Sequence, residues 1–176
     1  MLLDFLKIAS NLKKIPRQGW IDKLSLEHPE SVADHTFSMM VMGMVLSDLE
    51  NYDTQKILKM ILLHDLAEAV TGDLTPEQKP KNEKIKLEDF TIKGILSNLS
   101  EKLEKQYLEI WAEFQENQTR ESKYVHQIDK LEMALQAMTY SKEINSLEKV
   151  TPFLESAKNE LNDPNLLKLF EQIISK

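Results

Sequence analysis

An all-α fold is the structure that this sequence predicts, and three observations favour it. Apolar residues recur at three- and four-residue spacing almost throughout the chain, which is the period of an amphipathic helix. The 176 residues include only four glycines, so few turns with a positive φ are expected. No alternating apolar and polar stretch reaches the length of a strand. We therefore expect one helical bundle of about six to eight helices that spans residues 1–176.

The N-terminal segment predicts a first helix from about Leu2 to Ile15. Its apolar residues form one stripe, and Pro16 ends it because proline cannot continue a helix. We interpret residues 17–29 as a structured connector. This arrangement brings the chain to the start of the second helix.

The second helix begins near Ser31, which with Asp34 resembles a capping box, and continues to about Leu49. Its methionines and leucine make it apolar on nearly all sides. A helix of this kind is expected at the centre of a fold.

The third helix is expected to follow Asp53 and to run to about Val70, where Gly72 ends it. A polar loop rich in proline and lysine comes next. The helices expected after this loop span about residues 83–98, 100–117 and 119–144, with two short ones after Thr151-Pro152 and Asp163-Pro164. A proline directly after threonine or aspartate fits the first position of a helix.

The composition argues against several classes of protein. Without cysteine, the chain has no disulfides, zinc ribbons or catalytic thiols. The net charge of -7 argues against a nucleic-acid groove, but it permits a small anionic substrate if a bound dication reverses the local field. No apolar run approaches the ~20 residues of a membrane span, and the amphipathic N-terminus is unlike a signal peptide. We therefore expect a cytoplasmic protein without nucleic-acid or membrane partners.

Two histidines and two aspartates form the most informative pattern. His35 falls early in the second expected helix, His64 and Asp65 fall late in the third, and Asp129 lies inside the sixth. Each adjoins an apolar stretch, where an unpaired polar side chain is costly. Neutral imidazole and carboxylate are common ligands of divalent transition metals, and four of them leave positions open for a water. The pattern favours a metal-dependent hydrolase.

Longer motifs surround these residues. They are RQGW at 17–20, HPESVADHTF at 28–37, LLHDLAEAVTGDLTP at 62–76 and IDKLEMALQA at 128–137. Through them the chain resembles the HD-domain phosphohydrolases, and more narrowly it is similar to the 5′-deoxynucleotidase branch of that superfamily. The motif-bearing core covers about residues 17–140 of an expected single HD domain.

The resemblance implies a fold, an activity and a ligand set. It makes His35, His64, Asp65 and Asp129 the ligands of one divalent metal ion, with Co²⁺ or Mn²⁺ expected and Zn²⁺, Ni²⁺, Fe²⁺ or Mg²⁺ also compatible. It implies removal of phosphate from (deoxy)ribonucleoside 5′-monophosphates, with preference for the deoxy form. It also implies a homodimer.

The same resemblance assigns one catalytic residue and three substrate-binding residues. Glu68 lies one turn beyond His64 and three residues after Asp65, so these positions share a face of the expected third helix. A carboxylate there could orient or deprotonate the attacking water, or protonate the leaving oxygen. The resemblance makes Glu68 catalytic and brings Arg17, Trp20 and Asp73 to the substrate. Arginine holds phosphate bidentately, and tryptophan can form a wall against a sugar or a base.

Two other kinds of function stay open from the sequence. Related HD proteins include cyclic-nucleotide phosphodiesterases, alarmone hydrolases and dNTP triphosphohydrolases. The chain is short for several of these and lacks additional histidine pairs for a second metal. The other possibility is a non-catalytic helical module that senses nucleotide or metal, against which the intact Glu68 and all four ligand positions weigh.

Overall fold

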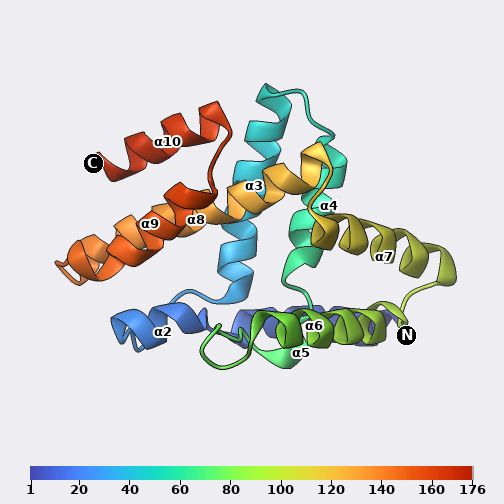
Figure 1. Ribbon diagram of the computed structural model, residues 1–176. Coiled ribbons are helices and arrows are strands. Elements are labelled where there is room, and N and C mark those ends of the chain that lie inside the picture. The colour runs from blue at the N-terminus through green and yellow to red at the C-terminus, as the bar shows by residue number, and fades with distance from the viewer. Residues whose placement is uncertain (176) are drawn as a thin grey trace.

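The computed structural model describes residues 1–175, and within this range the chain is built from helices (Figure 1). The described residues form ten α-helices and two 3₁₀ helices without a strand, which confirms the all-α prediction and exceeds the predicted number of helices. Their bounds are α1 Leu2–Ser10, η1 Asn11–Lys14, α2 Gln18–Leu24, α3 Val32–Leu49, α4 Thr54–His64, α5 Glu68–Thr71, α6 Lys81–Leu96, α7 Glu101–Glu116, α8 Arg120–Glu143, η2 Glu148–Val150, α9 Thr151–Glu160 and α10 Pro164–Ile174.

Helices α3 and α8 organise the fold. They cross near the middle of the molecule, with α4 packed against both (Figure 1). Helices α9 and α10 pack on α8, and α7 packs on α4. Helix α6 lies at the opposite end with α1 and α5, so the two termini are on opposite sides of the molecule (Figure 1).

Three clusters of buried apolar side chains hold this arrangement together. The largest joins α3, α4 and α8 to the C-terminal helices and includes Met39, Ile61 and Ile128, all fully buried. A second cluster joins η1, α4, α5, α6 and α7, and a third attaches α2 to α8 through Trp20. Full burial of one such side chain stabilises the fold by about 1.5–3 kcal/mol. Together, the three clusters therefore hold the helices and turns that carry the predicted site residues.

The first helix is shorter than predicted. Helix α1 ends at Ser10, and the chain continues as the 3₁₀ helix η1 before Pro16. Only Leu12 of the predicted stripe is buried, whereas Leu2 and Leu6 are more than half exposed. The expected connector also contains a helix, α2, which begins immediately after Arg17.

The third predicted helix is broken in the middle. Helix α4 ends at His64, and Asp65 leaves the helical conformation with φ -110° and ψ 10°. A new short helix, α5, spans Glu68–Thr71, and Gly72 caps it with a φ of 75° that suits glycine. The prediction of one continuous helix to Val70 was wrong because Asp65 caps α4 instead of extending it.

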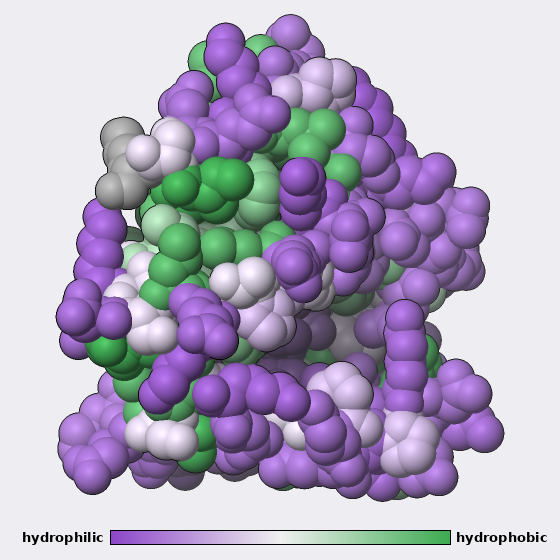
Figure 2. Space-filling view, turned by 60° about the vertical axis from the view of Figure 1, so that its left-hand side comes forward, coloured by the Kyte–Doolittle hydropathy of each residue, from purple (hydrophilic) through white to green (hydrophobic). Residues whose placement is uncertain are grey.

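Helix α3 begins as predicted but is not buried on all sides. Ser31 and Asp34 form the expected capping box. Phe37, Val41 and Met44 are exposed, so one face of α3 stays open. This face borders two apolar grooves of about 760 and 530 Å³, one toward α8 and α10 and the other toward η1 and α4. Figure 2 shows hydrophobic side chains gathered in a patch on a mainly hydrophilic face.

No helix among residues 1–175 combines the length and the hydropathy that a membrane crossing requires.

Candidate active site

The two predicted histidine ligands lie side by side. His35 is fully buried in the first turn of α3, and His64 is the buried last residue of α4. Their ring centroids are 5.6 Å apart. One ligand atom each from His35, His64 and Asp129 can be chosen so that all three atoms lie within 4.8 Å of one another. The packing of α3, α4 and α8 thus brings together residues that are far apart in the sequence.

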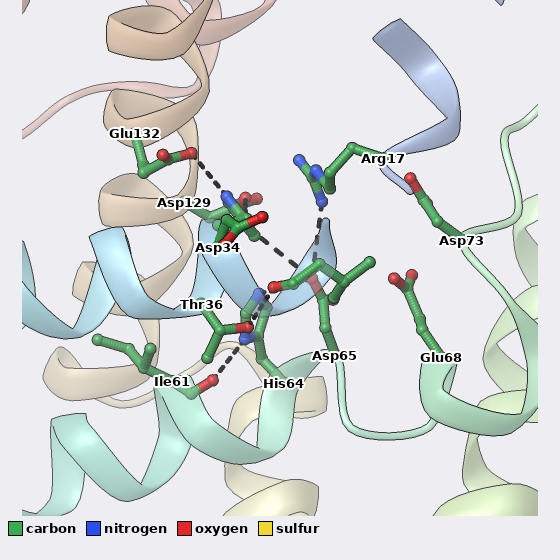
Figure 3. Close-up of polar contacts among 12 residues, drawn as sticks. Arg17, Asp34, Thr36, Ile61, His64, Asp65, Glu68, Asp73, Asp129 and Glu132 are labelled. Carbon is green, nitrogen blue, oxygen red and sulfur yellow. Dashed lines mark hydrogen bonds and ion pairs between the residues drawn. The ribbon is translucent and has the colours of Figure 1, made fainter. Parts of the chain in front are cut away.

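The fourth predicted ligand lies next to these three. Oδ2 of Asp65 is 3.0 Å from Nε2 of His64 and 3.9 Å from Nε2 of His35. On the other side, Oδ1 of Asp129 is 3.3 Å from Nε2 of His35. Figure 3 shows these carboxylates converging from α8 and from the turn that follows α4. All four predicted ligands therefore gather in one place.

Each imidazole is held by a contact at its other nitrogen. Nδ1 of His35 lies 2.6 Å from Oε2 of Glu132, and Nδ1 of His64 lies 2.6 Å from the carbonyl oxygen of Ile61. An Nδ1–H that donates to these oxygens leaves the Nε2 lone pair free. Such contacts orient a metal-binding imidazole and increase its basicity.

The residues present fit a divalent cation. Nε2 of His35, Nε2 of His64 and Oδ2 of Asp65 are buried and lack a hydrogen-bond partner. An unsatisfied buried polar atom costs about 1–3 kcal/mol, so three of them at one point need an explanation. Two imidazoles and two carboxylates are a donor set that Mn²⁺, Fe²⁺, Co²⁺, Ni²⁺ and Zn²⁺ accept.

The local charges also favour a cation. Burial raises the pKa of Asp65, but His64 and Arg17 outweigh it and hold that pKa well below its usual range. Burial and Arg17 lower the pKa of His35, yet the neighbouring carboxylates of Asp129 and Glu132 raise it to about 9. The surrounding carboxylates thus draw positive charge into the site even without a metal ion.

Glu68 lies beside this cluster at the start of α5. It is only 2% exposed, and Oε1 accepts a hydrogen bond from Nζ of Lys84 at 3.1 Å. Its second oxygen, Oε2, is buried without a partner. Burial raises the pKa of Glu68 well above its ordinary value, and the charges of Asp65 and Asp73 add to this effect. The group therefore has one oxygen available for a proton.

Arg17 and Asp73 frame the other side of the site. Nη1 of Arg17 is 3.6 Å from Oδ2 of Asp65, and Oδ2 of Asp73 accepts a hydrogen bond of 2.8 Å from the backbone N–H of Gln18. In Figure 3 the guanidinium lies above Asp65, and Glu68 and Asp73 lie to the right, with their carboxylates directed toward the same space. The loop after α5 is thus tied to the start of α2.

Trp20 is a packed wall residue. It is 2% exposed, its Nε1–H donates to Oε1 of Glu30 at 2.8 Å, and its ring packs on Phe153 and Tyr140. The indole nitrogen is consequently engaged within the protein. Only a small part of the ring is accessible to a substrate.

A pocket of about 250 Å³ adjoins the cluster. Its lining includes Arg17, Trp20, Asp73, Lys84, Lys130 and Phe153. Three of these side chains are cationic in a protein with a net charge of -7. Nζ of Lys130 also pairs with Oδ2 of Asp129 at 3.3 Å. A small anionic molecule would meet three cationic side chains here.

Sequence reasoning missed Glu132 and Lys84. Glu132 is 2% exposed in α8, three residues after Asp129 and four after the core residue Ile128. Those spacings place it on the inward face of α8, and this signal could have identified it. Lys84 gave no comparable signal, because its contact with Glu68 depends on how α6 folds back over α5.

Comparison with known proteins agrees with this geometry. The pattern of the HD domain family matches residues 9–166. The human protein named 5′-deoxynucleotidase HDDC2 is 35% identical over 173 residues, covering 98% of this chain and 84% of its own. The Dictyostelium discoideum protein of the same name is 38% identical over 184 residues, covering 98% of this chain and 96% of its own.

Solved structures show the same fold. A conserved hypothetical protein from Pyrococcus furiosus superimposes with a TM-score of 0.80 at 30% identity, over 99% of both chains. The PH0347 protein from Pyrococcus horikoshii OT3 gives a TM-score of 0.78 at 32% identity, over 98% of both chains. Together with the family match and the gathered histidines and aspartates, these relatives show that the chain belongs to the HD domain family.

Proposed function

We propose that this protein is a metal-dependent 5′-deoxynucleotidase, a hydrolase that removes phosphate from (deoxy)ribonucleoside 5′-monophosphates and prefers the deoxy form. Relatives with that name match the chain at 35% and 38% identity over nearly its whole length. The observation that carries the proposal is the convergence of His35, His64 and Asp129 on one point, with Asp65 beside them.

The proposed ligands of the metal ion are His35, His64, Asp65 and Asp129. A divalent cation bound there would stabilise charge on the phosphoryl group and lower the pKa of a coordinated water. The buried Nε2 atoms of the two histidines, which have no hydrogen-bond partner, support this assignment. Because the donor set accepts several ions, we propose Co²⁺ or Mn²⁺ as the first to test.

The protein's own residues would divide the remaining tasks. Arg17 and Lys130, both in the pocket lining, are suited to hold the phosphate. Glu68 is proposed as the catalytic residue, because its free Oε2 can take a proton from the attacking water or give one to the leaving 5′-oxygen. Asp73 and Trp20 are proposed to border the sugar.

We further propose that residues 1–176 act as one HD domain and that the enzyme is a homodimer. The family match over residues 9–166 supports the first point. The open apolar face of α3, with Phe37, Val41 and Met44 exposed, supports the second. Contiguous apolar surface of this kind is typical of contact sites.

A screen of nucleotides against metals tests the proposed function. Each deoxy- and ribonucleoside 5′-monophosphate would be incubated with Co²⁺, Mn²⁺, Ni²⁺, Mg²⁺ or Zn²⁺, and free phosphate would be measured. We expect phosphate from dAMP and its relatives only when a metal is present. Ribonucleotides should react more slowly.

The same screen separates the competing functions. Pyrophosphate or tripolyphosphate released from other nucleotides would indicate a different HD activity, and so would opening of cyclic nucleotides. Binding of nucleotide without turnover under any metal would favour a sensing module and overturn the proposal.

A further inference from the structure

Lys84 connects three carboxylates at the edge of the candidate site. It projects from the first turn of α6, and its Nζ lies 3.1 Å from Oε1 of Glu68, 3.5 Å from Oε1 of Glu88 and 3.9 Å from Oδ1 of Asp73. Two of these carboxylates, Glu68 and Asp73, belong to the proposed machinery. The lysine therefore links α6 to the site.

The surroundings stabilise the charged form of this ammonium group. Burial lowers the pKa of Lys84, but Glu68 and Glu88 more than compensate, so the pKa lies above its ordinary value. The side chain is 27% exposed, and that of Glu68 is 2% exposed. Charges this poorly solvated interact more strongly than a surface pair does.

Lys84 also fixes which oxygen of Glu68 is available. The ammonium group occupies Oε1, while Oε2 is buried and has no partner. Figure 3 shows the carboxylate of Glu68 directed toward the space below Arg17. Without Lys84 the carboxylate would lose the contact that sets its rotation.

The lysine faces the pocket as well as the carboxylates. It lines the pocket together with Arg17 and Lys130. If it were neutral, Asp73, Glu68 and Glu88 would leave uncompensated negative charge near the place where an anionic substrate has to enter.

We propose that Lys84 is a positioning residue of the reaction: it holds Glu68 so that the free oxygen faces the phosphate ester, and it compensates the carboxylates around the pocket. This inference rests on the proposed function. It assigns a role to a residue of α6, a helix that carries no other proposed site residue.

The test compares three variants of the full-length protein with the wild type. Lys84→Met removes the charge but keeps a long, unbranched side chain, whereas Lys84→Arg keeps the charge. Lys86→Met is the matched control at an exposed position of α6. Steady-state kinetics with dAMP and Co²⁺ would give kcat and KM. Circular dichroism and calorimetric titration with Co²⁺ would report folding and metal affinity.

We expect Lys84→Met to lower kcat about 10- to 100-fold, a part of the 10²- to 10⁴-fold that general acid–base catalysis supplies. Metal affinity and helix content should stay as in the wild type, because Lys84 makes no contact with the proposed ligands. Lys84→Arg should recover part of the loss, and Lys86→Met should behave as the wild type.

A double-mutant cycle with Glu68→Gln decides how Lys84 acts. If Lys84 works through Glu68, adding Lys84→Met to Glu68→Gln should lower kcat by less than about threefold, because residues that act as a unit are not additive. Additive losses would show that Lys84 acts independently of Glu68 and would overturn the proposed positioning role. Should Lys84→Met fail to fold, Lys84→Arg takes its place. The kcat of Lys84→Arg and a double-mutant cycle of Lys84→Arg with Glu68→Gln then make the same test.

The remaining outcomes separate the two proposals. A wild type that hydrolyses dAMP, with Lys84→Met as active as Lys86→Met, overturns the inference and leaves the proposed function standing. A wild type without turnover on any nucleoside monophosphate overturns the proposed function and the inference with it.

Discussion

The two histidines of the candidate site are held in different ways. His64 is oriented by the carbonyl oxygen of Ile61, three residues earlier in the same helix. His35 is oriented by Glu132, which is 97 residues away and belongs to another helix. One half of the site is therefore built by local backbone geometry and the other half by tertiary packing.

The carboxylates follow the same division. Asp65 is adjacent to His64 and turns into the site because α4 ends there, and Glu68 starts the next short helix. Asp129 reaches His35 only because α8 crosses α3. The difference teaches that a short sequence motif can supply the residues of one half of a site, whereas the other half depends on the core that joins α3 to α8.

The largest effect should come from the local half. We expect Asp65→Ala to reduce kcat/KM for dAMP to background, at least about 10³-fold, since it removes a proposed ligand beside both histidines. The apolar core does not contain Asp65, so the helix content should be unchanged. Phosphate release and circular dichroism check both expectations. A gross loss of helicity would mean that this half also supports the fold.

The tertiary half should respond more gradually. We expect Glu132→Ala to weaken Co²⁺ binding about 10- to 100-fold, because it removes the group that orients His35. Glu132→Gln keeps an acceptor oxygen and should retain more affinity than the alanine variant. Titration calorimetry with Co²⁺ measures both. Equal affinity in the wild type and Glu132→Ala would contradict the orienting role.

The local half of the site was easier to predict from the sequence than the half that depends on tertiary packing. The motif around His64 and Asp65 is contiguous, so residue types and spacing were enough to propose its members. Asp129 was also proposed, from its place beside apolar residues of a third expected helix, and the resemblance to a family motif then made it a metal ligand. Periodicity and caps likewise predicted α3, α7 and α8 to within a few residues.

The sequence could not predict features that depend on contacts across the fold. The break at Asp65 lies within a segment of continuous helical periodicity, and no proline or glycine marks it. The open face of α3 looks like core in the sequence, because methionine and valine give the same pattern in a core and in an exposed groove. The partners of Lys84 likewise depend on tertiary packing.

A smaller effect, on the stability of the protein, is expected where α3 packs against α4. A Cβ at Gly43 in α3 would overlap the side chain of Ile61 in α4, the residue whose carbonyl holds His64. We expect Gly43→Ala to destabilise the protein by about 1–3 kcal/mol through overpacking. Thermal unfolding measures this.

The matched control for that variant lies in α6. A Cβ at Gly94 would meet nothing within 4 Å, and the residue is helical. Gly94→Ala should therefore stabilise the protein by about 0.5–1 kcal/mol, the opposite sign. If both variants raised the melting temperature, the close approach of α3 and α4 at Gly43 would be wrong.

The smallest effect is expected from the N-terminal caps of α3 and α4, the helices that carry His35 and His64. Oγ of Ser31 accepts the N–H of Asp34 at the start of α3, and Oδ1 of Asp53 accepts the N–H of Lys56 at the start of α4. Ser31→Ala and Asp53→Ala should each cost about 0.5–2 kcal/mol of stability. His35 lies in the capped first turn, whereas His64 is at the far end of its helix. Only Ser31→Ala should therefore also weaken Co²⁺ binding, by about twofold to fivefold for a cap of this strength. Equal affinities in the two variants would show that contacts with α8, and not the cap, determine the position of His35.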